Sequence, residues 1–182
     1  IIVLGYESIS EVYEKIKEGQ KVDFYKEMAV TDTMTGVYNR FAFEEWEHET
    51  SDYEGYSIVT FDLNNLKWCN DNLGHAAGDA YIQASARIIK EIFGRHGKCY
   101  RIGDEFCTVI NQKSQKFDNA RHVKQLRELE KYVEEELEIK GLNVQIACGY
   151  AEYDIKTDKN FEDTRSRADK KMYESKRRLK RE

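Results

Sequence analysis

Features that define several other classes of protein are missing from this chain of 182 residues. No run of about 18 apolar residues occurs, so we expect no membrane-spanning helix. The four cysteines follow no CxxC or similar metal-binding spacing and lie in or beside apolar runs, which predicts reduced, mostly buried thiols. We therefore expect a cytoplasmic protein, or the cytoplasmic part of a longer, membrane-anchored one.

An excess of positive charge is also lacking. The formal net charge is −5, and the charged residues, 35% of the chain, are of mixed sign. General polyanion binders are basic, so we expect no nucleic-acid binding. Residues 170–182 are an exception, with seven Lys or Arg against two Glu. This segment is either a solvated last helix or a local anion site, and composition leaves both interpretations open.

Length and apolar content predict one domain with an appendage. We assign residues 1–30 to an N-terminal helical stalk or connector and residues 31–182 to the compact domain. Helical spacing over residues 8–29 supports the first assignment, with one apolar face formed by Ile9, Val12, Tyr13 and Ile16. An ordinary helix packed on its own domain fits the same periodicity.

The compact part alternates helices with strands. In chain order we expect a turn at 31–40, a helix through 41–46, a strand at 57–63, a helix at 76–93, a hairpin at 99–110, a helix at 119–139, a strand at 142–150 and a helix at 161–180. This order predicts an α/β (α+β) fold, with a central, mostly antiparallel sheet flanked by helices. A ferredoxin-like βαββαβ arrangement fits the central part and places the first strand beside the hairpin.

Acidic side chains stand where two of these strands end. Asp62 follows the apolar run 57–61, and Asp104 and Glu105 lie within the predicted hairpin. Carboxylates held on rigid backbone can converge on Mg²⁺, which prefers oxygen ligands and leaves positions open for phosphate. Each acid taken singly is more typical of a turn or a surface than of a metal site, so a metal site requires the two segments to meet.

Four segments of the chain resemble the motifs of one family. They are residues 32–40, 61–79, 100–106 and 168–176. In order and spacing they are similar to the opening motif, the first strand with its guanine-binding segment, the signature hairpin and the C-terminal helix of the GGDEF domain, the diguanylate cyclases. The resemblance covers residues 30–180 and implies a palm-type fold similar to that of nucleotide cyclases.

The resemblance also implies an activity. Two GTP molecules are condensed to cyclic di-GMP and pyrophosphate by two domains that face each other as a homodimer. Each 3′-hydroxyl attacks the α-phosphate of the opposing GTP, with Mg²⁺ or Mn²⁺ as cofactor. Because the chain begins at Ile1 without a Met, we expect a fragment that lacks an upstream sensor domain.

Carried over by position, Asp62 would hold the metal with help from the Leu63 carbonyl. Asp104 and Glu105 match the acidic pair, which supplies a further metal ligand and a candidate for assisting deprotonation of the 3′-hydroxyl. The basic residues that match the phosphate-binding positions, or lie near them, are Lys176, Lys180 and Lys67. Lys176 and Lys180 are spaced i, i+4 and can point at one phosphate chain, although exposed lysines are common.

The remaining matched residues, Asn70 and Asp79, would bind guanine. An aspartate accepts from the N1–H and the N2 amino group, and an asparagine amide both donates and accepts. Adenine would leave buried polar groups mispaired, at about 1–3 kcal/mol for each, which argues against an ATP cyclase. Helix capping is an alternative role for both residues.

Three positions depart from the family pattern. The hairpin has one glycine, Gly103, where the family has two, and we infer a deletion because Arg101 then keeps its usual register. The loss should tighten or re-aim the hairpin, unless the loop re-forms around Gly103. Asn64 replaces a usual Asp and removes a negative charge near the site. Lys98 stands where an Asp would complete a product-inhibition site, so we expect none.

Three interpretations remain open. The chain is an active diguanylate cyclase, a GTP-binding regulatory module in which catalysis is lost, or a purely structural dimerisation domain. The single glycine and Asn64 favour the second interpretation, whereas the guanine and phosphate positions count against the third.

Overall fold

The computed structural model describes residues 9–113, 116–137, 142 and 144–181. Its elements are α1 (Ile9–Val30), α2 (Arg40–Glu49), β1 (Tyr56–Leu63), α3 (Leu66–Leu73), α4 (His75–Phe93), β2 (Gly97–Ile102), β3 (Glu105–Asn111), α5 (Asn119–Leu137), β4 (Ile146–Glu152) and α6 (Phe161–Leu179). The strands form a four-stranded sheet in the order β2–β3–β1–β4, and each neighbouring pair is antiparallel. This is the expected ferredoxin-like fold.

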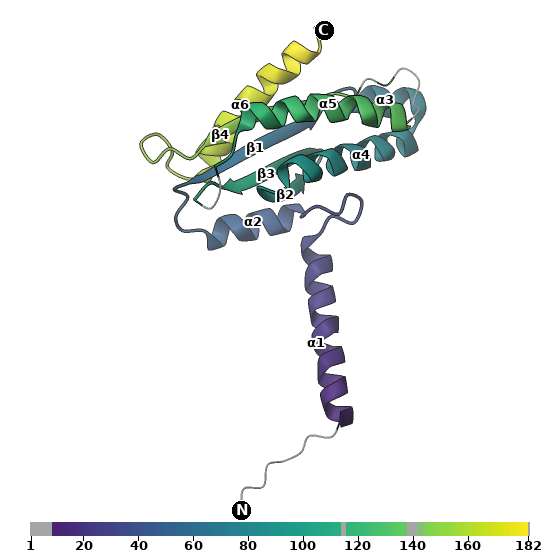
Figure 1. Cartoon of the computed structure of the whole chain (residues 1–182), viewed down its shortest axis with the longest axis vertical. Helices are drawn as coiled ribbons and strands as arrows, with labels where there is room; N and C mark the ends of the chain where they lie inside the picture. The colour runs from purple at the N-terminus through teal and green to yellow at the C-terminus, as the bar shows by residue number, and fades with distance from the viewer. Residues whose placement is uncertain (1–8, 114–115, 138–141, 143, 182) are drawn as a thin grey trace, which may run out of the picture.

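The central strand β1 is buried on both faces because helices cover both sides of the sheet. Val59 and Phe61 belong to a core formed with α4 and α5, which run beside each other over one face (Figure 1). Ile58 belongs to a second core on the opposite face, where it packs with side chains of α2 and α6. Since successive side chains alternate, Asp62 lies on the α6 side.

Helix α1 projects away from the body of the molecule (Figure 1). Its large apolar side chains are each more than half exposed, namely Ile16, Val22, Phe24, Tyr25 and Met28. The expected apolar face at 9–13 lies outside the residues whose side chains are described. The exposure agrees with a stalk or connector and not with a helix packed on its own domain. The division of the chain at residue 30 remains a prediction.

The structure differs from the expected elements in two places. Helix α3 is an additional element, and the strand predicted at 142–150 is β4, which begins later, at Ile146. Leu142 and Val144 are buried but precede the ladder. Side chains of α5 form hydrogen bonds with the main chain of Ile146. Glu130 accepts from its amide at 2.6 Å and Arg127 donates to its carbonyl at 2.9 Å. The predicted helix residues 8, 138 and 139 lie outside the described residues.

Within the described part of the chain, no helix has the length and apolar character needed to cross a bilayer. The cysteines are free thiols, buried at Cys69, Cys99 and Cys107 and half-buried at Cys148. Burial raises the pKa of Cys99 to about 11. The expectation of reduced, mostly buried thiols agrees with this arrangement.

Candidate active site

Three side chains predicted to act together do meet at the end of β1. Asp62 and Glu105 stand directly opposite each other in the β1–β3 ladder, where side chains share a face and their Cβ atoms are about 5 Å apart. Lys176 reaches Asp62 from α6, with its Nζ atom 2.6 and 2.7 Å from the two carboxylate oxygens. We call Asp62, Glu105 and Lys176 the acid–lysine cluster.

Negative charge is in excess around Glu105. Partial burial and the neighbouring carboxylates of Asp169 and Asp62 raise the pKa of Glu105, against the opposing effects of Arg165 and Lys176. A divalent cation would relieve this repulsion, so the donor set fits Mg²⁺. No three His, Cys, Asp or Glu side chains form a ready-made metal cluster among the described residues. Nucleotide or water oxygens would therefore have to complete the coordination shell.

The glycine at position 149 brings α6 close enough to place Lys176. A Cβ atom at Gly149 would lie 2.1 Å from the carbonyl oxygen of Ala168 and 2.3 Å from the amide nitrogen of Met172. The backbone of α6 therefore packs directly on β4. Lys176 follows Met172 by about one helical turn, which carries its ammonium group over Asp62 in β1.

The shortened signature forms a two-residue hairpin turn. Ile102 pairs with Glu105, so Gly103 and Asp104 alone connect β2 to β3. Gly103 has φ +69°, which is typical of the first position in a two-residue hairpin turn. The loop is a tight turn, as the loss of one glycine predicts, with Asp104 exposed at its tip. Asp104 thus lies in the turn and not at the ladder position opposite Asp62.

The opening segment holds this hairpin in place. Arg101 donates from Nη1 to Asp32 at 3.2 Å and from Nε to the Gly103 carbonyl at 3.1 Å. The pKa of Asp32 is lowered, because hydrogen bonds from Thr35 and the charge of Arg101 outweigh its partial burial. Sequence reasoning matched Asp32 and Arg101 to motifs but assigned them no role. It also overlooked Asp169, whose position in a motif was the available signal.

The guanine-binding candidates lie on two consecutive helices. Asn70 is on α3 and Asp79 is on α4, and Gly74 joins the helices with φ +87°. A Cβ atom at Gly78 would lie 1.8 Å from Asn70 Oδ1, so the Asn70 amide rests against backbone next to Asp79. Neither residue caps a helix, because the N-caps are Asn65 and Gly74. The capping alternative is therefore wrong.

The other predicted residues are less closely assembled. Lys67 is exposed in the first turn of α3, and Lys180 is exposed at the C-cap of α6. The Leu63 side chain is buried, and the role of its carbonyl as a metal ligand remains a prediction. Asn64 is buried, and its amide nitrogen lies 3.4 Å from Gln145 Oε1. The Asn64 side-chain amide therefore packs against Gln145. The main-chain carbonyl of Asn64 accepts from the Tyr81 hydroxyl at 2.8 Å.

Comparisons with known proteins identify the family of this chain. The sequence profile of the family described as "Diguanylate cyclase, GGDEF domain" matches residues 29–182. Diguanylate cyclase A of Treponema denticola is 32% identical over 164 residues, which cover 82% of this chain and 42% of that protein. Diguanylate cyclase DgcN of Escherichia coli is 38% identical over 87 residues, covering 45% of this chain and 21% of that protein. The chain thus spans less than half the length of either relative.

Solved structures show the same fold. The coiled coil and GGDEF domain of DgcB from Caulobacter crescentus, solved in complex with c-di-GMP, aligns with a TM-score of 0.72 at 22% identity, covering 92% of this chain and 91% of that one. Diguanylate cyclase SiaD from Pseudomonas aeruginosa, solved with its activator SiaC, aligns with a TM-score of 0.68 at 25% identity, covering 93% and 66%. These structures show the fold, and the profile match over residues 29–182 shows that the chain belongs to the GGDEF domain family.

Proposed function

We propose that this domain is a Mg²⁺-dependent diguanylate cyclase that condenses two GTP molecules to cyclic di-GMP and pyrophosphate as a homodimer. The observation that carries the proposal is the acid–lysine cluster, in which two carboxylates on paired strands face an ammonium group from α6. Rigid backbone holds these charges in place before substrate arrives, which is the arrangement that phosphoryl transfer requires.

Asp62 and Glu105 are the residues that would hold Mg²⁺, with the Leu63 carbonyl beside them. The ion would supply positive charge to neutralise the GTP phosphates during the transfer. Both carboxylate oxygens of Asp62 contact Lys176. If Asp62 bound Mg²⁺ instead, the Lys176 ammonium group would be available to bind a phosphate oxygen of GTP. Lys180 and Lys67, both exposed, would bind the outer phosphates.

The bond changes follow from the two-domain arrangement. The 3′-oxygen of one GTP forms a bond to the α-phosphorus of the other, the bond from that phosphorus to pyrophosphate breaks, and the 3′-hydroxyl proton must be accepted. Asp104 is exposed at the tip of the turn, where the GTP of an opposing domain can approach it. We assign it to that proton and Glu105 to the metal. Asn70 and Asp79 would bind guanine at the junction of α3 and α4.

The assignment to signalling draws on the relatives. Two of them are named as diguanylate cyclases, and the coiled coil and GGDEF domain of DgcB were solved in complex with c-di-GMP. By analogy, α1 would connect this domain to an upstream sensor within a longer protein. We place that protein, or this part of it, in the cytoplasm, where GTP is available.

A second function is favoured by one observation. The hairpin turn has two residues and a single glycine, and a displacement of about 1 Å at a reacting group can cost on the order of 100-fold in rate. A domain that binds GTP but does not turn it over would act as a regulatory or dimerisation module.

The experiment is incubation of the domain at high concentration with GTP and Mg²⁺, with products separated by chromatography and GTP affinity and dimer mass measured in parallel. Cyclic di-GMP formation supports the cyclase. GTP binding by a dimer without product supports the regulatory module, and no binding contradicts both. A variant with a glycine inserted after Gly103 should then regain turnover, by up to about 100-fold, if the deletion is the defect.

A further inference from the structure

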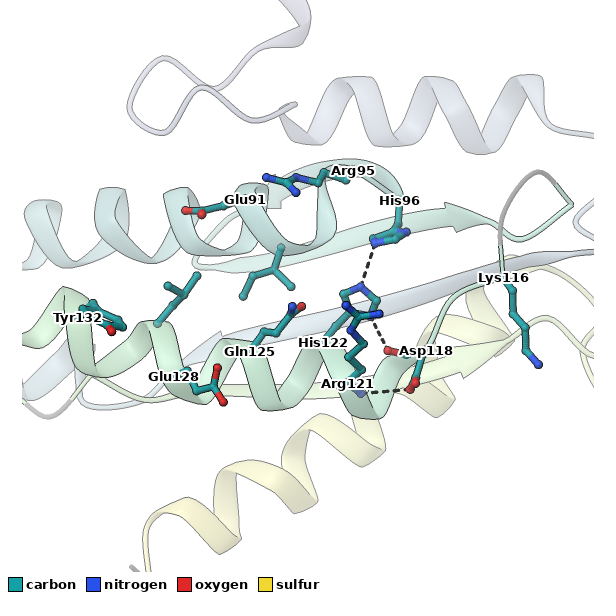
Figure 2. Close-up of a pocket in the computed structure, with 12 residues that line it drawn as sticks. Glu91, Arg95, His96, Lys116, Asp118, Arg121, His122, Gln125, Glu128 and Tyr132 are labelled. Atoms are coloured by element: carbon teal, nitrogen blue, oxygen red, sulfur yellow. Dashed lines mark hydrogen bonds between the residues drawn. The ribbon is translucent and has the colours of Figure 1, made fainter.

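Two histidines face each other at the end of the sheet that is remote from the hairpin turn. His96 lies between α4 and β2, and His122 lies in the first turn of α5. Their Nε2 atoms are 2.9 Å apart. Both rings line a groove of about 610 Å³ between α4 and α5, and Figure 2 shows them pointing toward each other across it. No role in the GTP site uses either residue.

The tautomer of a neutral His122 ring follows from the contact of its second ring nitrogen. His122 Nδ1 contacts the main-chain carbonyl oxygen of Asp118, and a carbonyl oxygen can only accept, so Nδ1 carries the proton. With this tautomer the lone pair of Nε2 faces His96, whose Nε2 would act as the donor. Stacking on Phe117, with ring centroids 4.6 Å apart, also holds the His122 ring in place. A carbonyl behind one ring nitrogen is the usual support for an imidazole that ligates metal through the other.

We propose that His96 and His122 bind one transition-metal ion, Zn²⁺ or its neighbours Ni²⁺ and Cu²⁺, through their two Nε2 atoms. Imidazole nitrogens favour these metals. Bonds of about 2.0–2.1 Å at a tetrahedral angle would place the two nitrogens about 3.4 Å apart. The pair therefore needs to open by only about 0.5 Å, and the His96 proton moves to Nδ1 as the metal takes its place.

The surroundings leave room for the rest of the coordination shell. The groove is open to solvent, so water can fill the remaining positions. The charged side chains that line it balance in number, with Arg95, Lys116 and Arg121 opposed by Glu91, Asp118 and Glu128. His96 is half-buried and lies in the connection between α4 and β2, outside the helices and strands. A bound metal would join α5 to the connection between α4 and β2.

Calorimetric titration of the 182-residue chain with ZnCl₂ tests the site. Excess Mg²⁺ is kept present so that the acid–lysine cluster does not compete. We expect one equivalent of Zn²⁺ to bind, and His96→Gln to weaken binding by about 10-fold or more. The matched controls are His48→Gln and His75→Gln, which change the other two, exposed histidines. Equal affinity in His96→Gln, or an equal loss in His75→Gln, would overturn the proposal.

A second measurement covers the case in which His96→Gln does not fold. X-ray absorption of the wild-type chain loaded with Zn²⁺ should show two imidazole nitrogens bound to the metal, and a shell of oxygen alone contradicts the site. The double variant Asp62→Asn, Glu105→Gln should keep its zinc, because the histidine pair does not depend on the proposed GTP chemistry. Loss of zinc in this variant would instead place the ion at the acid–lysine cluster.

Discussion

The two halves of the candidate active site are built in different ways. The acid–lysine cluster lies on paired strands, and its lysine comes from a helix packed directly against β4 at Gly149. The proposed guanine-binding half lies on α3 and α4, joined through Gly74, with Asp79 exposed. The first half is held by the hydrogen bonds of paired strands, whereas the second is held by the packing of two helices that meet at Gly74 and come into close contact at Gly78.

This difference separates two demands on the site. Charge stabilisation in a transition state requires donors and charges that are placed beforehand. Base recognition requires only that polar groups find their partners once the ligand has arrived. We therefore expect changes in the sheet half to affect turnover or folding strongly, and changes in the helix half to affect nucleotide preference moderately.

The largest effect should come from Asp62→Ala. Removal of this carboxylate takes away the partner of Lys176 and the proposed metal ligand. It should lower turnover by on the order of 100- to 1000-fold and abolish the Mg²⁺ dependence of GTP affinity. Product formation and GTP titration with and without Mg²⁺ measure both. Asp52→Ala, at an exposed acid paired with Lys113, is the matched control. Unaltered Mg²⁺-dependent binding would reject the metal assignment.

The next effect concerns the anchor of α6. Asp158 is buried and accepts hydrogen bonds from Arg167, Thr164 and the Asp154 amide. Burial alone would raise its pKa, but these bonds, with that of Thr157, hold the pKa well below the ordinary value of 3.8. Asp158→Asn should lower the free energy of unfolding at neutral pH by about 3 kcal/mol.

The sign of its pH dependence follows from the lowered pKa. The stability contributed by ionised Asp158 is present above the ordinary carboxyl pKa of 3.8 and is lost as the pH falls toward the folded-state pKa. The difference in unfolding free energy between wild type and Asp158→Asn, measured by urea unfolding, should therefore become smaller below about pH 3.8. The exposed neighbour Asp154→Asn is the control. A gap that is independent of pH would show that the Asp158 charge does not stabilise the fold.

Gly149→Ala tests how α6 is seated. The added methyl group would press on the backbone at Ala168 and Met172, so we expect a loss of about 2 kcal/mol in unfolding free energy, together with reduced turnover as Lys176 moves from Asp62. Gly19→Ala meets no atom within 4 Å and should be neutral or slightly stabilising in a helix. A Gly149→Ala variant with wild-type stability would show that α6 can shift without cost.

The smallest effect is expected from Asp79→Ala. Loss of the carboxylate should remove the preference for GTP over ATP, with GTP affinity falling about tenfold, which is about 1.4 kcal/mol. Calorimetric titration with each nucleotide measures the preference. Asp71→Ala changes an exposed acid on the neighbouring helix α3 and should leave the nucleotide preference unchanged. Wild-type guanine selectivity in Asp79→Ala would remove Asp79 from base recognition.

Much of the sheet half could be predicted from the sequence. The order of strands and helices gives a βαββαβ fold, and that topology places Asp62 beside the hairpin. The sequence could not show that Gly149 is the contact that brings Lys176 to Asp62, because a glycine in a strand gives no sign of what packs against it. The tight turn at Gly103 was expected, but the packing of Asn64 against Gln145 was not, since its burial depends on segments distant in sequence.

The helix half was predicted less well. Leu66, Cys69 and Leu73 have helical spacing, yet α3 is only eight residues long and so short a pattern is ambiguous.

The start of strand β4 in the sheet was placed too early because Leu142, Val144 and Ile146 alternate as a strand does. Buried apolar side chains of an irregular segment can produce the same alternation, and only the ladder distinguishes them.

The way α1 is attached has a mechanical consequence. Its 22 residues form a rod about 33 Å long, and Asn39 binds its last turn through the carbonyl oxygens of Val30 and Ala29. The neighbouring Tyr38 donates to Cys99 and accepts from Arg101 on β2. These contacts connect the end of α1 to β2, the strand that leads to Gly103. A sideways displacement of the far end of α1 would therefore apply a torque to β2 next to the hairpin turn.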